Sequence, residues 1–409
     1  MRLLLLVAVA LLAACSPRPA LHVAGAKAES FRIADGDFDR DPRTVTGAAA
    51  ALDLDVAVRA FDEAYAGVEG ALGPDRLPAA GRIAAVRARL AARALWSPEE
   101  LVEELVALFR CPDGHLAFGW DGRLPLRLEA WPRFLGGGEA RGEEEAVSLV
   151  PGAVPRLVVR TFDSAAAAEL AALPAIARSL RRLPAFVVDL RGNGGGNFGY
   201  AERFVLELTD RTLRRLDERE VVSVAAAEGR ANSARRRLAL GEVPAAAEPL
   251  FRAHVEALES AAAALRARGA GRVERVATGG VIRGRAPGPL RARVVMLVDG
   301  GCASACEMAV ALARQIPGVI VAGESTRGSM AAGEIALFRL PRSGVTISLG
   351  TRAFRDPLGG FAETRGFLPD VRLFGADAAA RAGALALEHD PVAPSRVESP
   401  LPTRVSSWQ

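Results

Sequence analysis

The chain has 409 residues, of which 50% are hydrophobic, and this is enough for one large domain or two ordinary ones. Its formal net charge of +4 is small for this length, and its basic residues are nearly all Arg, with Lys27 the single lysine. Because few aromatic residues stand among the arginines, the composition argues against a nucleic-acid-binding protein.

The N-terminus has the pattern of a targeting segment. Arg2 precedes an apolar run over residues 3–12, which is too short for an ordinary transmembrane helix. The run ends in Leu12-Ala13-Ala14-Cys15, which resembles a bacterial lipoprotein signal in which Cys15 is diacylated. A plain secretory signal is the alternative, and both interpretations predict export.

We therefore expect residues 1–14 to be a signal peptide and residues 15–45 to be a tether anchored in the bacterial membrane by lipid on Cys15. Ser16 stands where an Asp would favour retention at the inner membrane, so the expected location is the outer membrane, facing the periplasm. No later stretch is long and apolar enough to span a bilayer.

Residues 46–118 are predicted to form an N-terminal helical subdomain, with helices over residues 49–66, 82–95 and 101–109. The last of these begins at Ser97-Pro98-Glu99-Glu100, which combines a cap, a proline in the first turn and acidic residues near the positive end of the helix. After it come turn residues and His115, which on these residues alone is expected to be structural.

Strands and helices alternate through the middle of the chain. Strands are expected at residues 124–128, 157–161, 186–190, 294–298 and 318–322, and helices at residues 165–183 and 303–315. Pro174 is expected to kink or divide the first of these helices. Residues 212–288 are Ala/Arg/Glu-rich and are predicted to be a mostly helical insertion, and residues 379–409 to be the end of a helix and a disordered tail.

Ser304 follows the strand at 294–298 and a Gly-Gly turn, and it precedes a helix. It could be an ordinary helix cap. It could also be a nucleophile, because the unpaired N–H groups of a first helical turn would hold an oxyanion formed beside it.

The strand at 186–190 runs into Arg191-Gly192-Asn193-Gly194-Gly195-Gly196-Asn197. Successive glycines let the backbone approach a ligand closely. The loop is not a phosphate loop, because it has neither the G-x-G-x-x-G spacing nor a Lys-Ser/Thr after the glycines.

Four motifs follow one another in the chain: Asp-Leu-Arg-Gly-Asn-Gly-Gly-Gly from Asp189, Ser-Ala-x-Glu from Ser304, Gly-Glu-x-Thr-x-Gly from Gly323, and Glu-Thr-Arg-Gly-Phe-Leu-Pro-Asp from Glu363. In this order they resemble the tail-specific (C-terminal-processing) and tricorn-type serine peptidase family, over roughly residues 45–375. The resemblance implies an α/β, crotonase-like core, which we expect over residues 119–378. Many members of this family carry a PDZ domain, for which this chain has no room.

The best-known branch of that family uses a Ser–Lys dyad, but Ser329 stands at the lysine position and Lys27 lies in the tether. The segment Asp113-Gly114-His115 resembles the segment that carries the general base in another branch, with Leu116 in place of the usual Thr. The resemblance therefore implies His115 as the base for Ser304, which needs one to attack a carbonyl.

The expected acid that fixes the tautomer of His115 is Glu363, which lies where tricorn-like relatives have their acid. Glu363 could equally be a solvated loop carboxylate. Asp113, Glu324 and Asp356 compete for the same role.

The expected oxyanion donors are the N–H groups of Ala305 and of Gly194 or Gly195. Glu307 could instead be structural. No metal or cofactor is expected, because the cysteines lack ligand partners at metal-binding spacing.

The predicted function is that of an exported, lipid-anchored serine peptidase that acts on a peptide or protein substrate through a Ser304–His115–Glu363 triad. The alternative is a non-catalytic binding protein that keeps the peptidase fold. A crotonase-type acyl-CoA enzyme is disfavoured, because export would separate it from a cytosolic cofactor.

The remaining cysteines are Cys111, Cys302 and Cys306. If His115 and Ser304 share a hydrogen bond, the segments that carry these cysteines converge, and we expect a disulfide from Cys111 to Cys302 or Cys306. Cys302 and Cys306 lie so near each other along a turn and helix that we do not expect them to form the disulfide. Three free buried thiols are the alternative.

Overall fold

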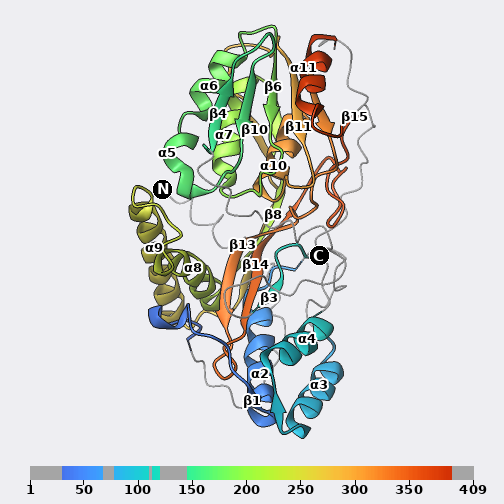
Figure 1. Cartoon of the computed structure of the whole chain (residues 1–409). Helices are drawn as coiled ribbons and strands as arrows, with labels where there is room; N and C mark the ends of the chain where they lie inside the picture. The colour runs from blue at the N-terminus through green and yellow to red at the C-terminus, as the bar shows by residue number, and fades with distance from the viewer. Residues whose placement is uncertain (1–29, 68–77, 110–112, 120–144, 389–409) are drawn as a thin grey trace, which may run out of the picture. The chain divides into compact units, whose positions relative to one another are not determined.

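The computed structural model describes residues 30–67, 78–109, 113–119 and 145–388 (Figure 1). The predicted signal peptide, Cys15, Cys111, the strand at 124–128 and the C-terminal tail lie outside these residues. None of the helices within the described ranges is long and apolar enough to cross a membrane.

The described residues form two compact units, each built from separate stretches of the chain. Unit 1 takes its residues from Met1–Ala140, Arg215–Gly280 and Gly328–Gly366, and unit 2 from Arg141–Arg214, Val281–Arg327 and Phe367–Gln409.

Unit 2 is built on a six-stranded sheet with the order β15-β12-β11-β6-β5-β4. Its strands are β4 (Val147–Val150), β5 (Arg156–Val159), β6 (Ala185–Asp189), β11 (Arg293–Val298), β12 (Val319–Gly323) and β15 (Val371–Arg372). All neighbours are parallel except β4 and β5. A separate antiparallel pair joins β7 (Thr212–Arg214) to β10 (Val281–Arg283).

Helices cover both faces of this sheet (Figure 1). On one face α11 (Ala378–Glu388) packs Ala378, Ala382 and Ala386 against β6 and β11. The other face carries α5 (Ala167–Leu170), α6 (Leu173–Leu180), α7 (Phe198–Leu208) and α10 (Ala305–Ala313). Burial on both faces explains why β6, β11 and β12 are continuous apolar runs, which made them predictable.

Unit 1 has an antiparallel sheet, with the order β13-β14-β8-β9 and with β3 paired to β14. Its strands are β3 (Ala117–Gly119), β8 (Asp217–Val222), β9 (Val273–Ala277), β13 (Ala332–Arg339) and β14 (Thr346–Arg355). Two short strands, β1 (Val45–Thr46) and β2 (Leu95–Trp96), pair with each other.

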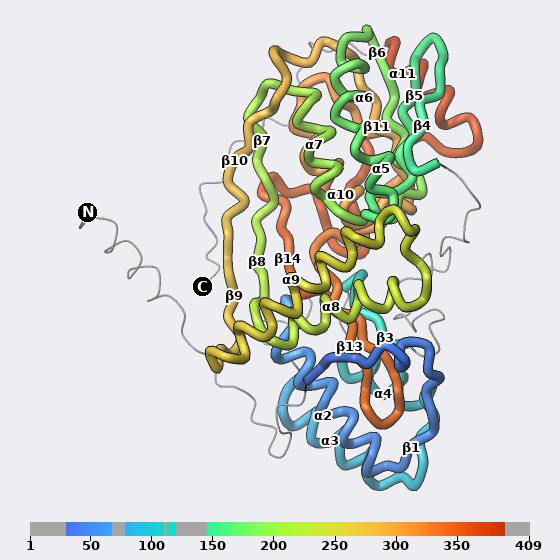
Figure 2. Tube along the Cα trace, turned by 90° about the vertical axis from the view of Figure 1, so that its left-hand side faces the viewer, coloured from blue at the N-terminus to red at the C-terminus, as the bar shows by residue number. Residues whose placement is uncertain are grey.

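The helices of unit 1 are α2 (Gly47–Ala64), α3 (Ala80–Ala92), α4 (Pro98–Leu108), α8 (Val224–Ala239) and α9 (Glu248–Ala267), with a short 3₁₀ turn, η1, at Asp35–Asp37. Helices α8 and α9 run side by side (Figure 2). The three helices predicted before residue 110 are confirmed, and so is the start of α4, where Ser97 and Glu100 form a capping box.

The prediction of a mostly helical insertion over residues 212–288 is wrong in part. Helices α8 and α9 are present, but β7, β8, β9 and β10 belong to the same stretch. Strand β8 has the sequence Asp-Glu-Arg-Glu-Val-Val and no alternating apolar pattern. It forms antiparallel backbone ladders with β14 and β9, and across the first of these Arg352 on β14 contacts Glu220 on β8 at 2.9 Å.

One apolar cluster joins α2, α3 and α4 to β13 and β14 in unit 1. At its centre the ring of Phe61 stacks on that of Phe109, with 4.0 Å between centroids. Phe61 also contacts Tyr65 and lies near Phe118. The pairing of helices with sheet therefore depends on a few aromatic side chains.

We expect Phe61→Ala to lower the free energy of unfolding by about 3–5 kcal/mol, because it removes a buried ring and leaves a cavity. Urea unfolding of the purified chain measures the change. Leu52→Ala is the matched control on the same helix: Leu52 is 50% exposed whereas Phe61 is 1% exposed. A shift for Phe61→Ala no larger than that of the control would contradict this account of the core.

Candidate active site

Ser304 lies on a sharp turn between β11 and α10 in unit 2, at the N-cap position of the helix. Its backbone has φ 53° and ψ −116°, a conformation that costs energy for any residue with a side chain. Its neighbours Ala303 and Ala305 are buried, while Ser304 itself is partly exposed. A serine held on such a strand-to-helix turn presents its hydroxyl at the surface, as serine nucleophiles do.

The Gly-rich loop lies directly against this turn. A Cβ atom at Gly195, where φ is +97°, would be 2.9 Å from the Cβ of Ser304 and 2.9 Å from the nitrogen of Ala305. Only glycine fits this close approach. Asp299 links the two segments further, because one oxygen of its carboxylate accepts the N–H groups of Gly192 and Gly301, both at 2.8 Å.

The structure distinguishes the two predicted glycine donors. The N–H of Gly195 donates to the Asn193 side chain at 2.9 Å, so it is already used. Gly194 is exposed, and within the described ranges no acceptor contacts its N–H. The N–H of Ala305, in the first turn of α10, likewise has no acceptor there. These two N–H groups could stabilise an oxyanion.

Glu307 fixes the backbone of Ser304. Its fully buried carboxylate accepts the N–H of Ser304 at 3.1 Å and the hydroxyl of Thr326 at 2.7 Å. The Thr326 oxygen in turn accepts the N–H of Phe367 at 2.7 Å. These contacts agree with the structural role that was considered for Glu307 from the sequence. Thr326 was not singled out as a site residue, although it is the threonine of the Gly-Glu-x-Thr-x-Gly motif.

A buried cluster of charge anchors the start of the Gly-rich loop. Asp189 is fully buried and contacts Arg156 at 2.8 Å and Arg191 at 2.7 Å. Burial pushes the pKa of Asp189 upward, but the hydrogen bonds and charges of Arg191 and Arg156 outweigh it and hold that pKa below its ordinary value. Asp189 therefore stays ionised and ties the loop to the sheet.

The predicted disulfide from Cys111 to Cys302 or Cys306 is wrong, because Cys302 and Cys306 are bonded to each other. The sharp turn at Ser304 folds Cys302 back toward the first turn of α10 and brings the two Cα atoms to 5.3 Å, within the range a disulfide needs. The bond therefore spans the candidate nucleophile.

His115 belongs to unit 1, where it follows the turn Asp113-Gly114. The buried carboxylate of Asp113 accepts the N–H of His115 at 2.8 Å and lies 4.0 Å from its Nδ1. Burial raises the pKa of Asp113, and the nearby His115 opposes that rise. The carbonyl of His115 accepts a hydrogen bond from Ser348 on β14 at 3.2 Å.

Glu363 is also in unit 1 and contacts the same segment. One carboxylate oxygen accepts the N–H of Gly114, and the other accepts the N–H of Ala331, both at 3.0 Å. The structure thus brings Glu363 to the residue before His115. Of the other predicted competitors, Glu324 is exposed in unit 2, and Asp356 accepts the N–H of Leu358 at 3.1 Å in unit 1.

Within the ranges that the structure describes, no group of three His, Cys, Asp or Glu side chains could hold a metal ion.

The sequence of the chain matches the model of one protein family. The model of peptidase family S41 matches residues 156–373, more than half of the chain. No curated protein sequence matches.

Several solved structures resemble the chain. The photosystem II D1 C-terminal processing protease is 20% identical, with 55% of this chain and 44% of that chain covered and a TM-score of 0.32. Mature CPAF is 19% identical, with 58% and 51% covered and a TM-score of 0.38. A putative peptidase from Parabacteroides merdae is 15% identical, with 84% and 99% covered and a TM-score of 0.47. The chain thus spans about half the length of the first two.

The contact between Gly195 and Ser304 predicts that Gly195→Ala destabilises the chain by about 1–3 kcal/mol, since the added methyl group meets backbone atoms at an unfavourable φ. Gly194→Ala is the control, because a Cβ there meets nothing within 4 Å, and we expect a change within about 0.5 kcal/mol. Thermal unfolding measures both. Equal stability of the two variants would show that the loop does not lie against Ser304 as described.

Proposed function

Because the chain belongs to peptidase family S41, we propose that it hydrolyses peptide bonds through an acyl-enzyme formed on Ser304. Membership confirms the family and the α/β fold class that the four motifs predicted, and it supports the predicted class of enzyme, a serine peptidase. The observation that carries the proposal lies within unit 2: the strained turn presents Ser304 beside the N–H groups of Gly194 and Ala305.

In this proposal His115 is the general base. It takes the proton of the Ser304 hydroxyl as the oxygen attacks the substrate carbonyl, and it returns that proton to the leaving amine. Negative charge on the carbonyl oxygen is stabilised by the two N–H groups. Water then attacks the acyl-enzyme, with His115 again acting as base, and releases the second peptide product.

We propose Glu363 as the acid of the triad. Its carboxylate is oriented by two N–H groups, one of them on the residue before His115. Asp113 is a poorer partner for the ring, because 4.0 Å is too long for a hydrogen bond and burial raises its pKa. Asp113 instead fixes the turn that carries His115.

The proposal predicts that a fluorophosphonate probe labels the wild-type chain and that Ser304→Ala abolishes labelling. His115→Ala should slow peptide hydrolysis by about a thousand-fold or more. Activity should rise with pH near neutrality as the imidazole loses its proton. Lys27→Ala is the control and should be fully active. An unlabelled wild-type chain would favour a binding protein that keeps the fold.

The choice of acid gives a separate prediction. Glu363→Gln should lower kcat with little change in KM, because it removes the negative charge that stabilises the His115 imidazolium and replaces one accepting oxygen by an NH2 group that only donates. Asp113→Asn should cost less activity. A larger loss of kcat in Asp113→Asn than in Glu363→Gln would reverse the two assignments.

We further propose that the chain is exported and anchored in the bacterial outer membrane by lipid on Cys15, with the peptidase facing the periplasm. The support is the sequence Leu12-Ala13-Ala14-Cys15 after an apolar run. Cys15→Ala should move the protein out of the membrane fraction or stall its processing, as fractionation and N-terminal sequencing would show. A processed Cys15→Ala chain that stays in the membrane fraction would exclude this anchor.

A further inference from the structure

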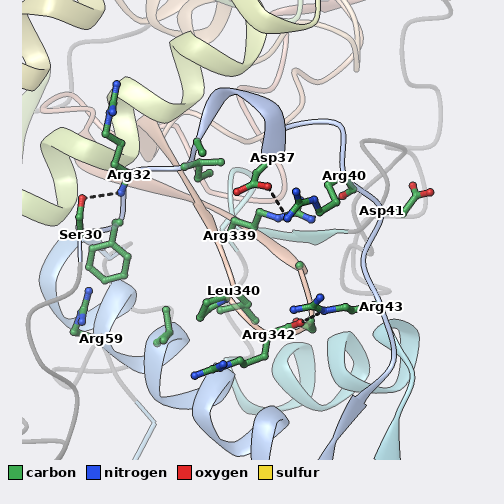
Figure 3. A pocket seen from close by; sticks show the side chains of 17 residues that line it. Ser30, Arg32, Asp37, Arg40, Asp41, Arg43, Arg59, Arg339, Leu340 and Arg342 are labelled. Carbon is green, nitrogen blue, oxygen red and sulfur yellow. Dashed lines mark hydrogen bonds and ion pairs between the residues drawn. The ribbon is translucent and has the colours of Figure 1, made fainter.

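Unit 1 contains a pocket of about 240 Å³ that none of the proposed catalytic residues lines (Figure 3). Its walls come from three parts of the chain: residues 30–43, which we call the N-terminal strap, helix α2, and the turn between β13 and β14 at residues 340–344. The pocket is large enough for a small ligand and too small for a folded partner.

The N-terminal strap is fixed at both ends. Near its start, the N–H of Phe31 donates to Glu228 at 2.8 Å, and Asn232 on α8 donates to the carbonyl of Phe31 at 2.7 Å. Near its end, the N–H of Arg43 donates to the carbonyl of Ser343 at 2.8 Å. Hydrogen bonds to the backbone of the strap therefore hold this pocket wall at both ends.

The lining is strongly basic although the chain as a whole is nearly balanced, with 52 basic and 48 acidic residues. Six arginines line the pocket, against two aspartates. The arginines are Arg32, Arg40, Arg43, Arg59, Arg339 and Arg342, and the aspartates are Asp37 and Asp41. The lining itself therefore carries more positive than negative side chains.

Three of the arginines have carboxylate partners. Arg40 contacts Asp37 at 2.8 Å, Arg32 contacts Glu259 at 3.3 Å, and Arg59 contacts Glu63 at 3.5 Å. The excess of positive charge in the lining therefore comes from the other three arginines.

Arg43, Arg339 and Arg342 make no ion pair within 4 Å among the described residues, although the charges of Asp37 and Asp39 act on Arg339 and that of Asp53 on Arg342. The guanidinium of Arg43 donates to the carbonyl of Arg342 at 2.8 Å, and that of Arg339 to the carbonyl of Arg40 at 2.7 Å. The Arg342 guanidinium has no hydrogen bond to any described residue. Burial lowers the pKa of Arg339. The nearby Arg40 and Arg43 add to that effect, and the charges of Asp37 and Asp39 oppose it. An anion would relieve this repulsion.

The backbone of Gly344 lies close to the guanidinium of Arg339. Its φ is +80°, and a Cβ there would lie 2.6 Å from an Nη atom of Arg339 and 3.2 Å from the Cα of Pro42. The turn therefore brings its backbone against the Arg339 guanidinium, which no side chain at this position would allow.

From this arrangement we propose that the pocket binds a phosphate group, either of a small soluble phosphate or of a lipid headgroup. Guanidinium groups match phosphate oxygens with paired hydrogen bonds. Three arginines that make no ion pair among the described residues suit a ligand with more than one negative charge better than they suit a single carboxylate.

Isothermal titration calorimetry with pyrophosphate at low ionic strength tests the proposal on the purified chain. We expect saturable binding that weakens about tenfold or more in Arg342→Gln, a variant that removes no hydrogen bond seen in the described residues. Arg339→Gln should weaken it similarly. Arg268→Gln is the matched control: it makes the same change of charge at an exposed arginine outside the pocket. Citrate is the carboxylate comparison.

The proposal is overturned if pyrophosphate does not bind, if Arg342→Gln and Arg339→Gln bind it as the control does, or if citrate binds and pyrophosphate does not. Flotation with phosphatidylglycerol vesicles then separates the two sources. Vesicle binding that falls in Arg342→Gln and is competed by pyrophosphate supports a headgroup. A soluble phosphate is supported if the wild type and Arg342→Gln bind vesicles equally and the wild type binds pyrophosphate tightly. Both vesicle comparisons use chains with the same N-terminus.

Discussion

The candidate site in unit 2 depends on the unusual backbone conformation of Ser304. A residue with a side chain at φ 53° and ψ −116° persists only where its surroundings hold it. The surroundings here are a buried carboxylate on its N–H, a glycine against its Cβ and a disulfide across it. The carboxylate and the disulfide are local, and only the glycine comes from a distant part of the chain, so the turn is fixed by local and tertiary contacts together.

The two units position their polar residues in different ways. In unit 2 the parallel strands end together, and the loops that follow β6 and β11 meet at one edge of the sheet. In unit 1 an antiparallel sheet carries the segment of His115 by pairing β3 with β14, and carboxylates tie that segment down through backbone N–H groups. Close packing in the first case and buried hydrogen bonds in the second both restrict motion at the candidate residues.

Much of unit 2 could be predicted from the sequence, because apolar runs such as that of β11 and the Ala-rich stretch of α10 carry local signals. Strand β8 could not, since its charged sequence has no apolar alternation and its partner β14 lies far along the chain. The pairing of Cys302 with Cys306 also escaped prediction. Four residues of ordinary helix or extended chain would not bring them to this geometry, and the unusual φ of Ser304 does. The role of Thr326 depends on its contact with Glu307, which spacing alone does not reveal.

The small loop closed by the Cys302–Cys306 bond limits what that bond can do. A cross-link stabilises a fold mainly by restricting the unfolded chain, and a loop of so few residues restricts it little. Its effect is therefore concentrated on the turn itself. A chain that folds where thiols stay reduced would keep the sheet and helices of unit 2 and lack the brace across Ser304. Completion of the nucleophile turn is in this way coupled to the redox conditions under which the chain matures.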